Sequence, residues 1–207
     1  MDFFSSEEIV ASLGDKAKMK GKLSFVRLCI LGIMAGFCIA LGYLAFIRIT
    51  GTAPTEWGSF NNFLGGALFP VGLIALTFVG GELATGNMMV MTLGVLQKKV
   101  RVGTLCYNWL VVLLTNCLGG FLVAYLFGHI VGLTEGAFLD KTVAVAQAKI
   151  ADPPLVAFVS GIGCNIFVCL AVYLGALAKS YLGKMFGLWF PVMVFVVCGF
   201  QQDRKSV

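Results

Sequence analysis

The run Gly80-Gly81-Glu82-Leu83-Ala84-Thr85-Gly86-Asn87 decides the fold, because it places glycines, a carboxylate, a hydroxyl and an amide inside a long hydrophobic region. That region covers residues 60–97 and holds no other charged residue. It is too long for one membrane crossing and too short for two crossings joined by a loop. Polar groups at membrane depth are costly unless they line a cavity or lie buried in protein. We therefore predict a helix that enters the membrane, breaks near Thr85 to Asn87 and continues obliquely to Lys98 and Lys99.

The composition of the whole chain agrees with a membrane protein. Its 207 residues are 59% hydrophobic and 12% charged, with a mean hydropathy of +0.94. A soluble chain of this size carries about 25% charged residues. Stretches free of Asp, Glu, Lys and Arg cover residues 28–47, 57–81, 83–97, 102–134, 153–178 and 185–202. Since about 20 apolar residues cross a bilayer as a helix, we predict an all-α polytopic membrane protein rather than an enzyme.

The distribution of charge predicts an orientation. Basic residues lie at the ends of hydrophobic segments, so the net charge of +5 does not indicate a nucleic-acid partner. With a cytoplasmic N-terminus, ten Lys and Arg residues fall on inner segments and only Arg48, Lys141 and Lys149 on outer ones. This fits the positive-inside tendency of a plasma-membrane protein. Residues 1–24 lack the apolar core of a signal peptide and are expected to form a cytoplasmic segment with a short helix.

The remaining segments suggest two related halves. Gly32 and Gly36 have the spacing of a closely packed helix, in a tight bundle or an oligomer. Further spans are expected at 103–131 and 155–178, joined by a long outer loop. The run Trp189-Phe190-Pro191-Val192 before Gly199 echoes Leu68-Phe69-Pro70-Val71 before Gly81. Two proline segments that end in glycine indicate paired broken helices of an inverted repeat.

Several motifs in order resemble the formate/nitrite transporter family. They are Gly81 to Asn87 followed by Lys98-Lys99, then Cys164-Asn165, then Trp189-Phe190-Pro191 leading to Gly199-Phe200-Gln201. The resemblance covers residues 7–201. It implies homopentamers with a pore in each protomer, built as an aquaporin-like inverted-repeat bundle with broken helices. It also implies passage of small monovalent anions or their weak acids: formate, nitrite, hydrosulfide or lactate-like acids.

The resemblance also assigns residues by position. It implies an inner constriction at Phe69 and Leu73, and an outer one that includes Phe195 and Val168. Other expected pathway residues are Leu83, Ala84, where the family often has an aromatic, Thr85, Asn165, Gln202 and, in the outer vestibule, Lys149. Glu82, Gly86 and Asn87 are expected to shape the helix break. No cofactor or metal is expected.

The C-terminal residues depart from the family pattern. Gln202 stands where the family has a pore histidine, and the sixth span is missing, so a channel domain at 25–202 is followed by an atypical tail at 203–207. Charges at Asp203, Arg204 and Lys205 at bilayer depth would cost roughly 2.5–3.5 kcal/mol each. We expect a gene truncated before its last helix, and the alternative function is a non-transporting relative.

Physical chemistry favours a weak-acid mechanism. Burying a bare carboxylate in an apolar slit costs at least several kcal/mol, and the neutral acid avoids most of this. Lys149 would attract anions with about 4 kcal/mol at 4 Å and an effective dielectric near 20, although a solvated loop lysine is the alternative. For Glu82 a structural role is favoured over proton transfer, and His129 is expected at an interface.

Two other function classes fit less well. A haem-bearing subunit normally needs intramembrane histidine pairs, and the chain has one histidine. An aquaporin-type pore for neutral solutes would show Asn-Pro-Ala at both breaks, and this chain has neither copy.

Overall fold

The computed structural model describes residues 3–199, which form an all-α bundle. Its α-helices are α1 (Ser6–Lys20), α2 (Phe25–Thr50), α3 (Ser59–Leu68), α4 (Val71–Val79), α5 (Ala84–Leu96), α6 (Val102–Val123), α7 (Leu139–Ala151), α8 (Pro154–Leu177) and α9 (Tyr181–Val197). Short helical turns lie at η1 (Thr55–Trp57), η2 (Ala124–Ile130) and η3 (Gly136–Phe138). Within the described residues, four helical stretches are long and apolar enough to cross a membrane: Phe25–Thr50, Ser59–Val79, Val102–Ile130 and Pro154–Leu177.

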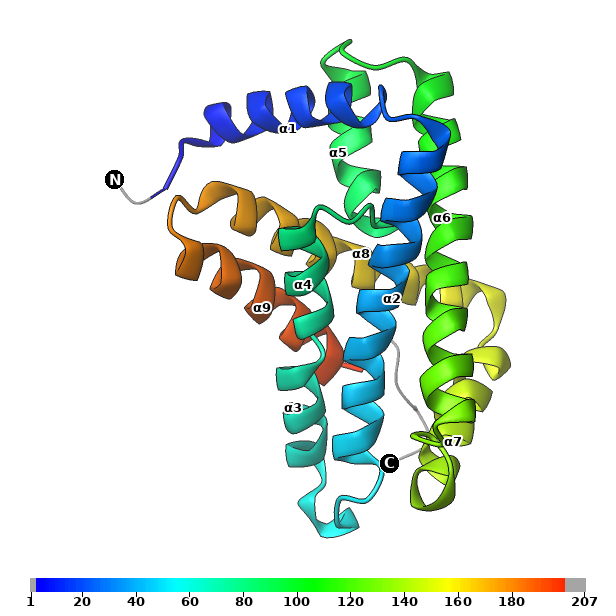
Figure 1. Ribbon diagram of the computed structural model, residues 1–207. Helices are drawn as coiled ribbons and strands as arrows, with labels where there is room; N and C mark the ends of the chain where they lie inside the picture. Colours follow the sequence, from blue (N-terminus) through cyan, green and yellow to red (C-terminus); the bar gives the residue numbers. More distant parts are fainter. Residues whose placement is uncertain (1–2, 200–207) are drawn as a thin grey trace.

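Two long helices, α2 and α6, run side by side through the bundle (Figure 1). Glycines bring them into backbone contact: a side chain at Gly36 would overlap the backbone of Asn116, and one at Gly119 would overlap the carbonyl of Ile33. Small residues permit this approach where lipid supplies no hydrophobic drive. The close packing predicted from Gly32 and Gly36 is therefore confirmed, and its partner is a helix of the same chain.

The chain from α3 to α5 crosses the bundle in three pieces (Figure 1). It is interrupted first at Phe69 and Pro70, and again between Val79 and Ala84. Gly80 ends α4 in the left-handed conformation, with φ of 77°, and its N–H bonds the Leu76 carbonyl.

The predicted position of the second break is wrong by one turn. Thr85 and Asn87 lie in the first turns of α5, and the Asn87 N–H bonds the Leu83 carbonyl at 2.8 Å. The paired glycines interrupt the helix, because Gly80 adopts a backbone conformation that other residues rarely take.

The end of α9 resembles the end of α4, as expected for a repeat. Helix α9 ends at Val197, and Gly199 has φ of 72°, close to that of Gly80. Pro191 lies inside α9 rather than at an interruption like that at Pro70. Helix α9 packs against α8 much as α3 and α4 pack against α2. The expectations for Gln202 and for residues 203–207 lie outside the described residues.

The two ends of the bundle differ. Helix α1 lies across the end where α5 joins α6, next to the basic turn, and α7 lies toward the opposite end (Figure 1). The expected short N-terminal helix is α1, which Ser5 caps. The segment 133–154, expected to be a long outer loop, contains helix α7. Its run Ala144-Val145-Ala146-Gln147-Ala148 is rich in alanine, the strongest helix former.

Candidate functional site

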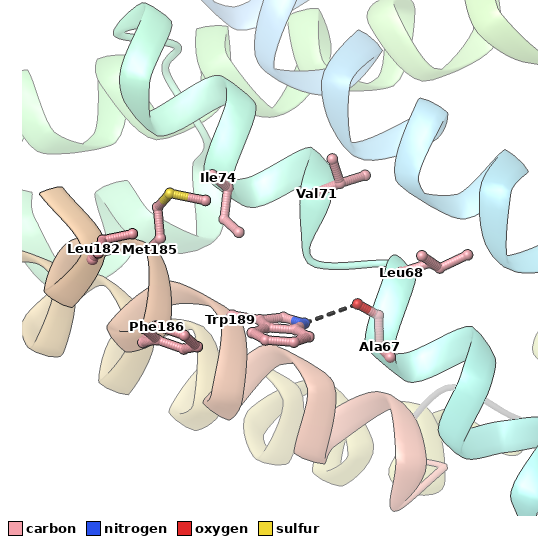
Figure 2. A pocket seen from close by; sticks show the side chains of 8 residues that line it. All are labelled: Ala67, Leu68, Val71, Ile74, Leu182, Met185, Phe186 and Trp189. Carbon is pink, nitrogen blue, oxygen red and sulfur yellow. Dashed lines mark hydrogen bonds between the residues drawn. The ribbon is translucent and has the colours of Figure 1, made fainter.

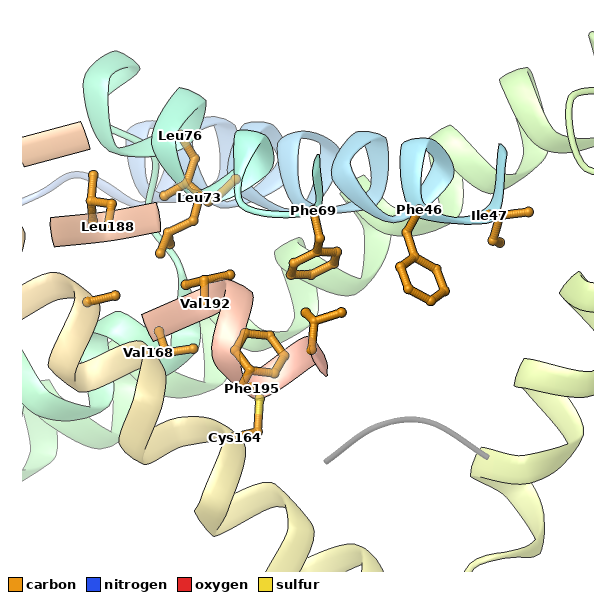
Figure 3. Packing of buried hydrophobic residues seen from close by; sticks show 13 residues of the cluster. Phe46, Ile47, Phe69, Leu73, Leu76, Cys164, Val168, Leu188, Val192 and Phe195 are labelled. Atoms are coloured by element: carbon orange, nitrogen blue, oxygen red, sulfur yellow. The ribbon is translucent and has the colours of Figure 1, made fainter. Parts of the chain in front are cut away.

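Buried side chains from both halves of the repeat meet between α2, α4, α8 and α9 (Figure 3). We call this group the central cluster. Its buried members are Ala35, Phe46, Ile47, Phe69, Leu73, Leu76, Cys164, Val168, Ala171, Leu188, Val192, Phe195 and Val196. The set includes four residues that the resemblance assigned to constrictions: Phe69, Leu73, Val168 and Phe195.

Two phenylalanines close the central cluster from opposite halves. Phe69, at the α3–α4 interruption, and Phe195, on α9, have ring centroids 5.7 Å apart in an edge-to-face arrangement (Figure 3). Tyr43 on α2 meets the Phe69 ring edge-to-face, with centroids 6.0 Å apart. The resemblance implied an inner constriction at Phe69 and an outer one at Phe195, and the two rings are in direct contact.

The start of α5 lies beside this cluster. Leu83 packs against the cluster, whereas Ala84 packs with Leu28 and Val112 in a separate cluster. A side chain at Gly86 would meet Val172 at 3.6 Å, so α5 and α8 approach closely here. Thr85 is partly exposed in the first turn. Helix α5 begins at the break, so the positive end of its dipole points there.

Asn165 connects α8 to α5. Its side-chain amide lies 3.5 Å from the Met88 sulfur, and its Oδ1 is buried with no hydrogen-bond partner in the described part of the chain. A buried polar atom left unpaired costs about 1–3 kcal/mol. A polar solute or water near Asn165 would remove this cost.

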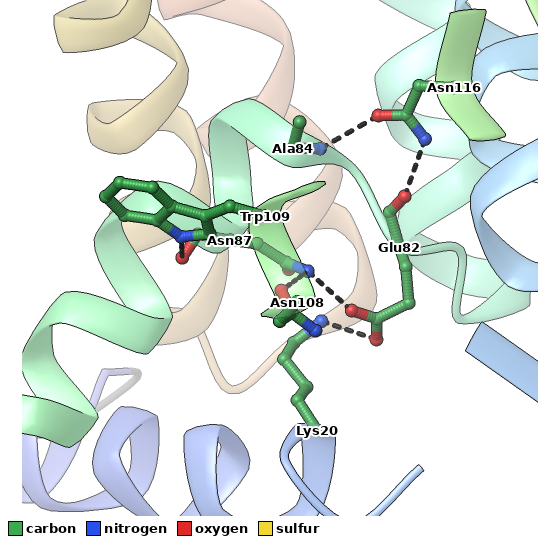
Figure 4. A network of polar contacts seen from close by, with 7 residues as sticks. All are labelled: Lys20, Glu82, Ala84, Asn87, Asn108, Trp109 and Asn116. Atoms are coloured by element: carbon green, nitrogen blue, oxygen red, sulfur yellow. Dashed lines mark hydrogen bonds and ion pairs between the residues drawn. The ribbon is translucent and has the colours of Figure 1, made fainter. Parts of the chain in front are cut away.

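A network of polar side chains holds the break in place (Figure 4). The Glu82 carboxylate, 5% exposed, accepts hydrogen bonds from Lys20 at 2.6 Å and from Asn87 at 2.7 Å. The Asn87 amide also donates to Asn108 Oδ1 at 2.9 Å. These contacts favour a structural role for Glu82, because both of its carboxylate oxygens are engaged.

A second asparagine, Asn116 on α6, replaces the missing helix bonds at the break. Its amide donates to the carbonyls of Gly32, at 2.8 Å, and Glu82, at 2.9 Å. Its Oδ1 accepts the first N–H of α5, from Ala84, at 2.9 Å (Figure 4). Exposed backbone groups in a membrane need partners, and Asn116 supplies them at the break for the Glu82 carbonyl and the Ala84 N–H.

Sequence reasoning missed the network residues on α1 and α6. Lys20 is 62 positions from Glu82, so spacing alone could not join them. Polar residues facing inward on a span were the available signal for Asn108, Asn116 and Trp109, whose indole N–H donates to the Asn87 carbonyl at 3.3 Å.

Cations lie over aromatic rings at the end of the bundle that carries α7. The Lys149 ammonium is 4.7 Å from the Tyr43 ring centroid, and the Arg48 guanidinium is 3.6 Å from that of Phe138. Arg48 also donates to the Leu133 carbonyl at 3.3 Å. Desolvation by the surrounding chain lowers the pKa of Lys149, although part of its side chain is exposed. This end of the cluster therefore carries positive charge beside Tyr43.

Two other features lie apart from the central cluster. His129 pairs with Glu135 at 3.0 Å on an exposed turn after α6. An apolar pocket of about 330 Å³ lies between α3, α4 and α9, where Trp189 donates its indole N–H to the Ala67 carbonyl at 2.8 Å (Figure 2). This bond satisfies a carbonyl next to the interruption at Phe69 and Pro70.

Comparisons with known proteins agree on one family. The family model described as "Formate/nitrite transporter" matches residues 7–202. "Uncharacterized transporter YrhG" of Bacillus subtilis (strain 168) is 46% identical over 202 residues, which are 97% of this chain and 76% of that protein. "Formate channel BtFdhC" of Bacillus thuringiensis is 42% identical over 202 residues, which are 98% of this chain and 78% of that protein.

Solved structures show the same fold. An "FNT family ion channel" superimposes with a TM-score of 0.85 at 23% identity, covering 95% of this chain and 78% of that one. A "Pentameric formate channel with formate bound" superimposes with a TM-score of 0.75 at 30% identity, covering 86% of this chain and 70% of that one.

Proposed function

Because this chain belongs to the formate/nitrite transporter family, we propose that it carries formate, nitrite or related small monovalent anions, or their weak acids, across the membrane. Formate is the first candidate, since a formate channel of Bacillus thuringiensis is 42% identical to this chain. The protein acts as a multi-pass channel in the plasma membrane. We assign the N-terminus and α1 to the cytoplasm, because the basic turn at Lys98 and Lys99 lies at the same end.

The central cluster supplies the path. The observation that carries the proposal is the Phe69–Phe195 contact, which closes an apolar slit between two polar regions. We take Lys149 and Tyr43 as one polar region, and Asn165, whose amide lies 3.5 Å from the sulfur of Met88 on α5, as the other. Separation of the two rings would open the slit for a small solute.

The chemistry of the slit selects the form that crosses. Lys149 attracts the anion toward the outer mouth. An apolar slit opposes the charged form by several kcal/mol, so the neutral acid is the form that passes the rings. The positive end of the α5 helix dipole favours negative charge on the other side.

The assembly is a homopentamer in which each protomer carries its own path. The proposal has two supports: one structural relative is a pentameric formate channel, and the four helices around the central cluster all come from one chain.

Flux measurements on purified protein test the function. Stopped-flow swelling of proteoliposomes in formate and nitrite gradients is expected to exceed that of empty vesicles severalfold. Flux equal to that of empty vesicles would contradict transport and support a non-transporting relative. If the vesicles carry hydrosulfide or lactate but not formate, the substrate of this protein is one of those other solutes of the family.

A further inference from the structure

Tyr43 forms the third wall of the aromatic closure. It lies on α2, where its ring stacks on Phe46 with centroids 5.7 Å apart and meets Phe69 at 87°. Phe69 in turn meets Phe195. The three rings of Tyr43, Phe69 and Phe195 therefore belong to one contact chain across the slit, and Tyr43 alone among them carries a polar group.

The hydroxyl of Tyr43 is buried and has no hydrogen-bond partner among residues 3–199. Buried tyrosine hydroxyls usually find a partner, because leaving a donor unpaired away from water is unfavourable. A donor kept without a protein partner beside a closure is available to a solute that reaches it. The ring is also placed where solutes are drawn, since the Lys149 ammonium lies 4.7 Å from its centroid.

We propose that Tyr43 donates a hydrogen bond to an oxygen of the substrate as it meets the aromatic closure. The inference rests on the proposed function and narrows its substrate class to oxyacids and their anions. Carboxyl and nitrite oxygens are strong acceptors for a phenolic O–H, whereas sulfur accepts weakly. Tyr43 therefore favours formate and nitrite over hydrosulfide. The neighbouring rings of Phe69 and Phe195 select solutes only by size and polarity.

Tyr43→Phe separates the hydroxyl from the ring, because phenylalanine preserves the contacts with Phe46 and Phe69. In proteoliposomes at low formate concentration, we expect formate flux to fall at least fivefold. The half-saturating formate concentration should rise, and hydrosulfide flux should stay within twofold of wild type. Tyr125→Phe is the matched control, since Tyr125 lies 49% exposed on η2, outside the central cluster, and should change neither flux.

The outcomes separate two failures. If wild-type protein carries no solute, the proposed function fails, and this inference falls with it. If wild-type protein carries formate and Tyr43→Phe leaves both formate flux and half-saturation unchanged, the inference alone is wrong. Equal losses of formate and hydrosulfide flux also overturn it, because they indicate a structural role for the hydroxyl. If wild-type protein does not carry hydrosulfide, the test is the half-saturating formate concentration, which Tyr43→Phe should raise if the inference is correct.

Discussion

Glu82 is a carboxylate inside an apolar bundle, and its partners make its charge tolerable. Its side chain is 5% exposed and bonds Lys20, whose side chain is 21% exposed. Removing one member of a buried pair leaves the other uncompensated, which costs more than the pair contributes. We expect Glu82→Gln to destabilise the folded protein by about 2 kcal/mol, a discounted value because Lys20 retains some solvent contact. Thermal unfolding in detergent measures this loss.

Asp15→Asn provides the matched control for this ion pair. Asp15 bonds Lys99 at 2.7 Å, but its side chain is 67% exposed. Exposed pairs contribute about 0–1 kcal/mol, so the melting temperature should hardly change. A similar loss of thermal stability in Glu82→Gln and Asp15→Asn would show that the burial of Glu82 does not cause the destabilisation.

Lys149 predicts a pH dependence of a definite sign. Desolvation lowers its pKa from the ordinary 10.5, so the ammonium loses its proton at a lower pH than a free lysine does. The attraction for anions is therefore complete well below this pKa and disappears as the pH rises through it. We expect Lys149→Met to reduce formate flux roughly tenfold at neutral pH.

The ratio of wild-type to Lys149→Met flux isolates the charge, because the supply of neutral acid at each pH is the same for both proteins. The ratio should fall toward one at alkaline pH. The ratio of Lys149→Arg flux to Lys149→Met flux should stay high at alkaline pH, since a guanidinium stays charged. A wild-type ratio that does not change with pH contradicts the assignment.

At the scale of the elements, Gly80 controls where α4 stops. Its φ of 77° is strained for any residue with a side chain, although no atom would obstruct one there. We expect Gly80→Ala to cost roughly 1–2 kcal/mol in thermal stability, from backbone strain alone. Gly86→Ala is the control: its new Cβ would meet Val172 at an ordinary 3.6 Å inside α5. Equal effects of the two changes would argue against a strained break at Gly80.

Helix α1 is attached to the bundle by one apolar face. Leu13, which is 1% exposed, packs in a cluster with Met91 on α5. Leu13→Ala is expected to weaken this docking by about 2–4 kcal/mol. Amide hydrogen exchange should then speed up in α1 and at the Lys20–Glu82 contact. Met19→Ala, at a residue 63% exposed, should leave exchange unchanged. Slow exchange in Leu13→Ala would show that other contacts hold α1.

The elements were predictable to different degrees, for physical reasons. A charge-free run of about 20 apolar residues has one stable arrangement in a membrane, so α2, α6 and α8 could be placed from the sequence. The break was predicted at the polar side chains of Thr85 to Asn87. It lies instead at the glycines, because the left-handed backbone conformation of Gly80 ends α4. Helix α7 was missed, because the segment between the spans was expected to be a long outer loop.

For the whole molecule, the site depended on contacts that no local pattern contains. Phe69 and Phe195 are two of 18 phenylalanines, and only the family resemblance selected them. Their mutual contact, which joins positions 126 residues apart, required the fold. The same is true of the Lys20–Glu82 pair and of the Tyr43 hydroxyl, which has no hydrogen-bond partner within residues 3–199.

A central cluster built from one chain predicts independent paths in the proposed pentamer. Val168, 6% exposed on α8, belongs to the cluster, so Val168→Trp should block the path of its own protomer. Pentamers co-expressed from wild-type and Val168→Trp chains carry two tags, and mass spectrometry measures their composition. Formate flux should fall in direct proportion to the blocked fraction. A pathway shared along the pentamer axis would instead lose nearly all flux once one or two protomers carry tryptophan, and that steep loss would place the path between subunits.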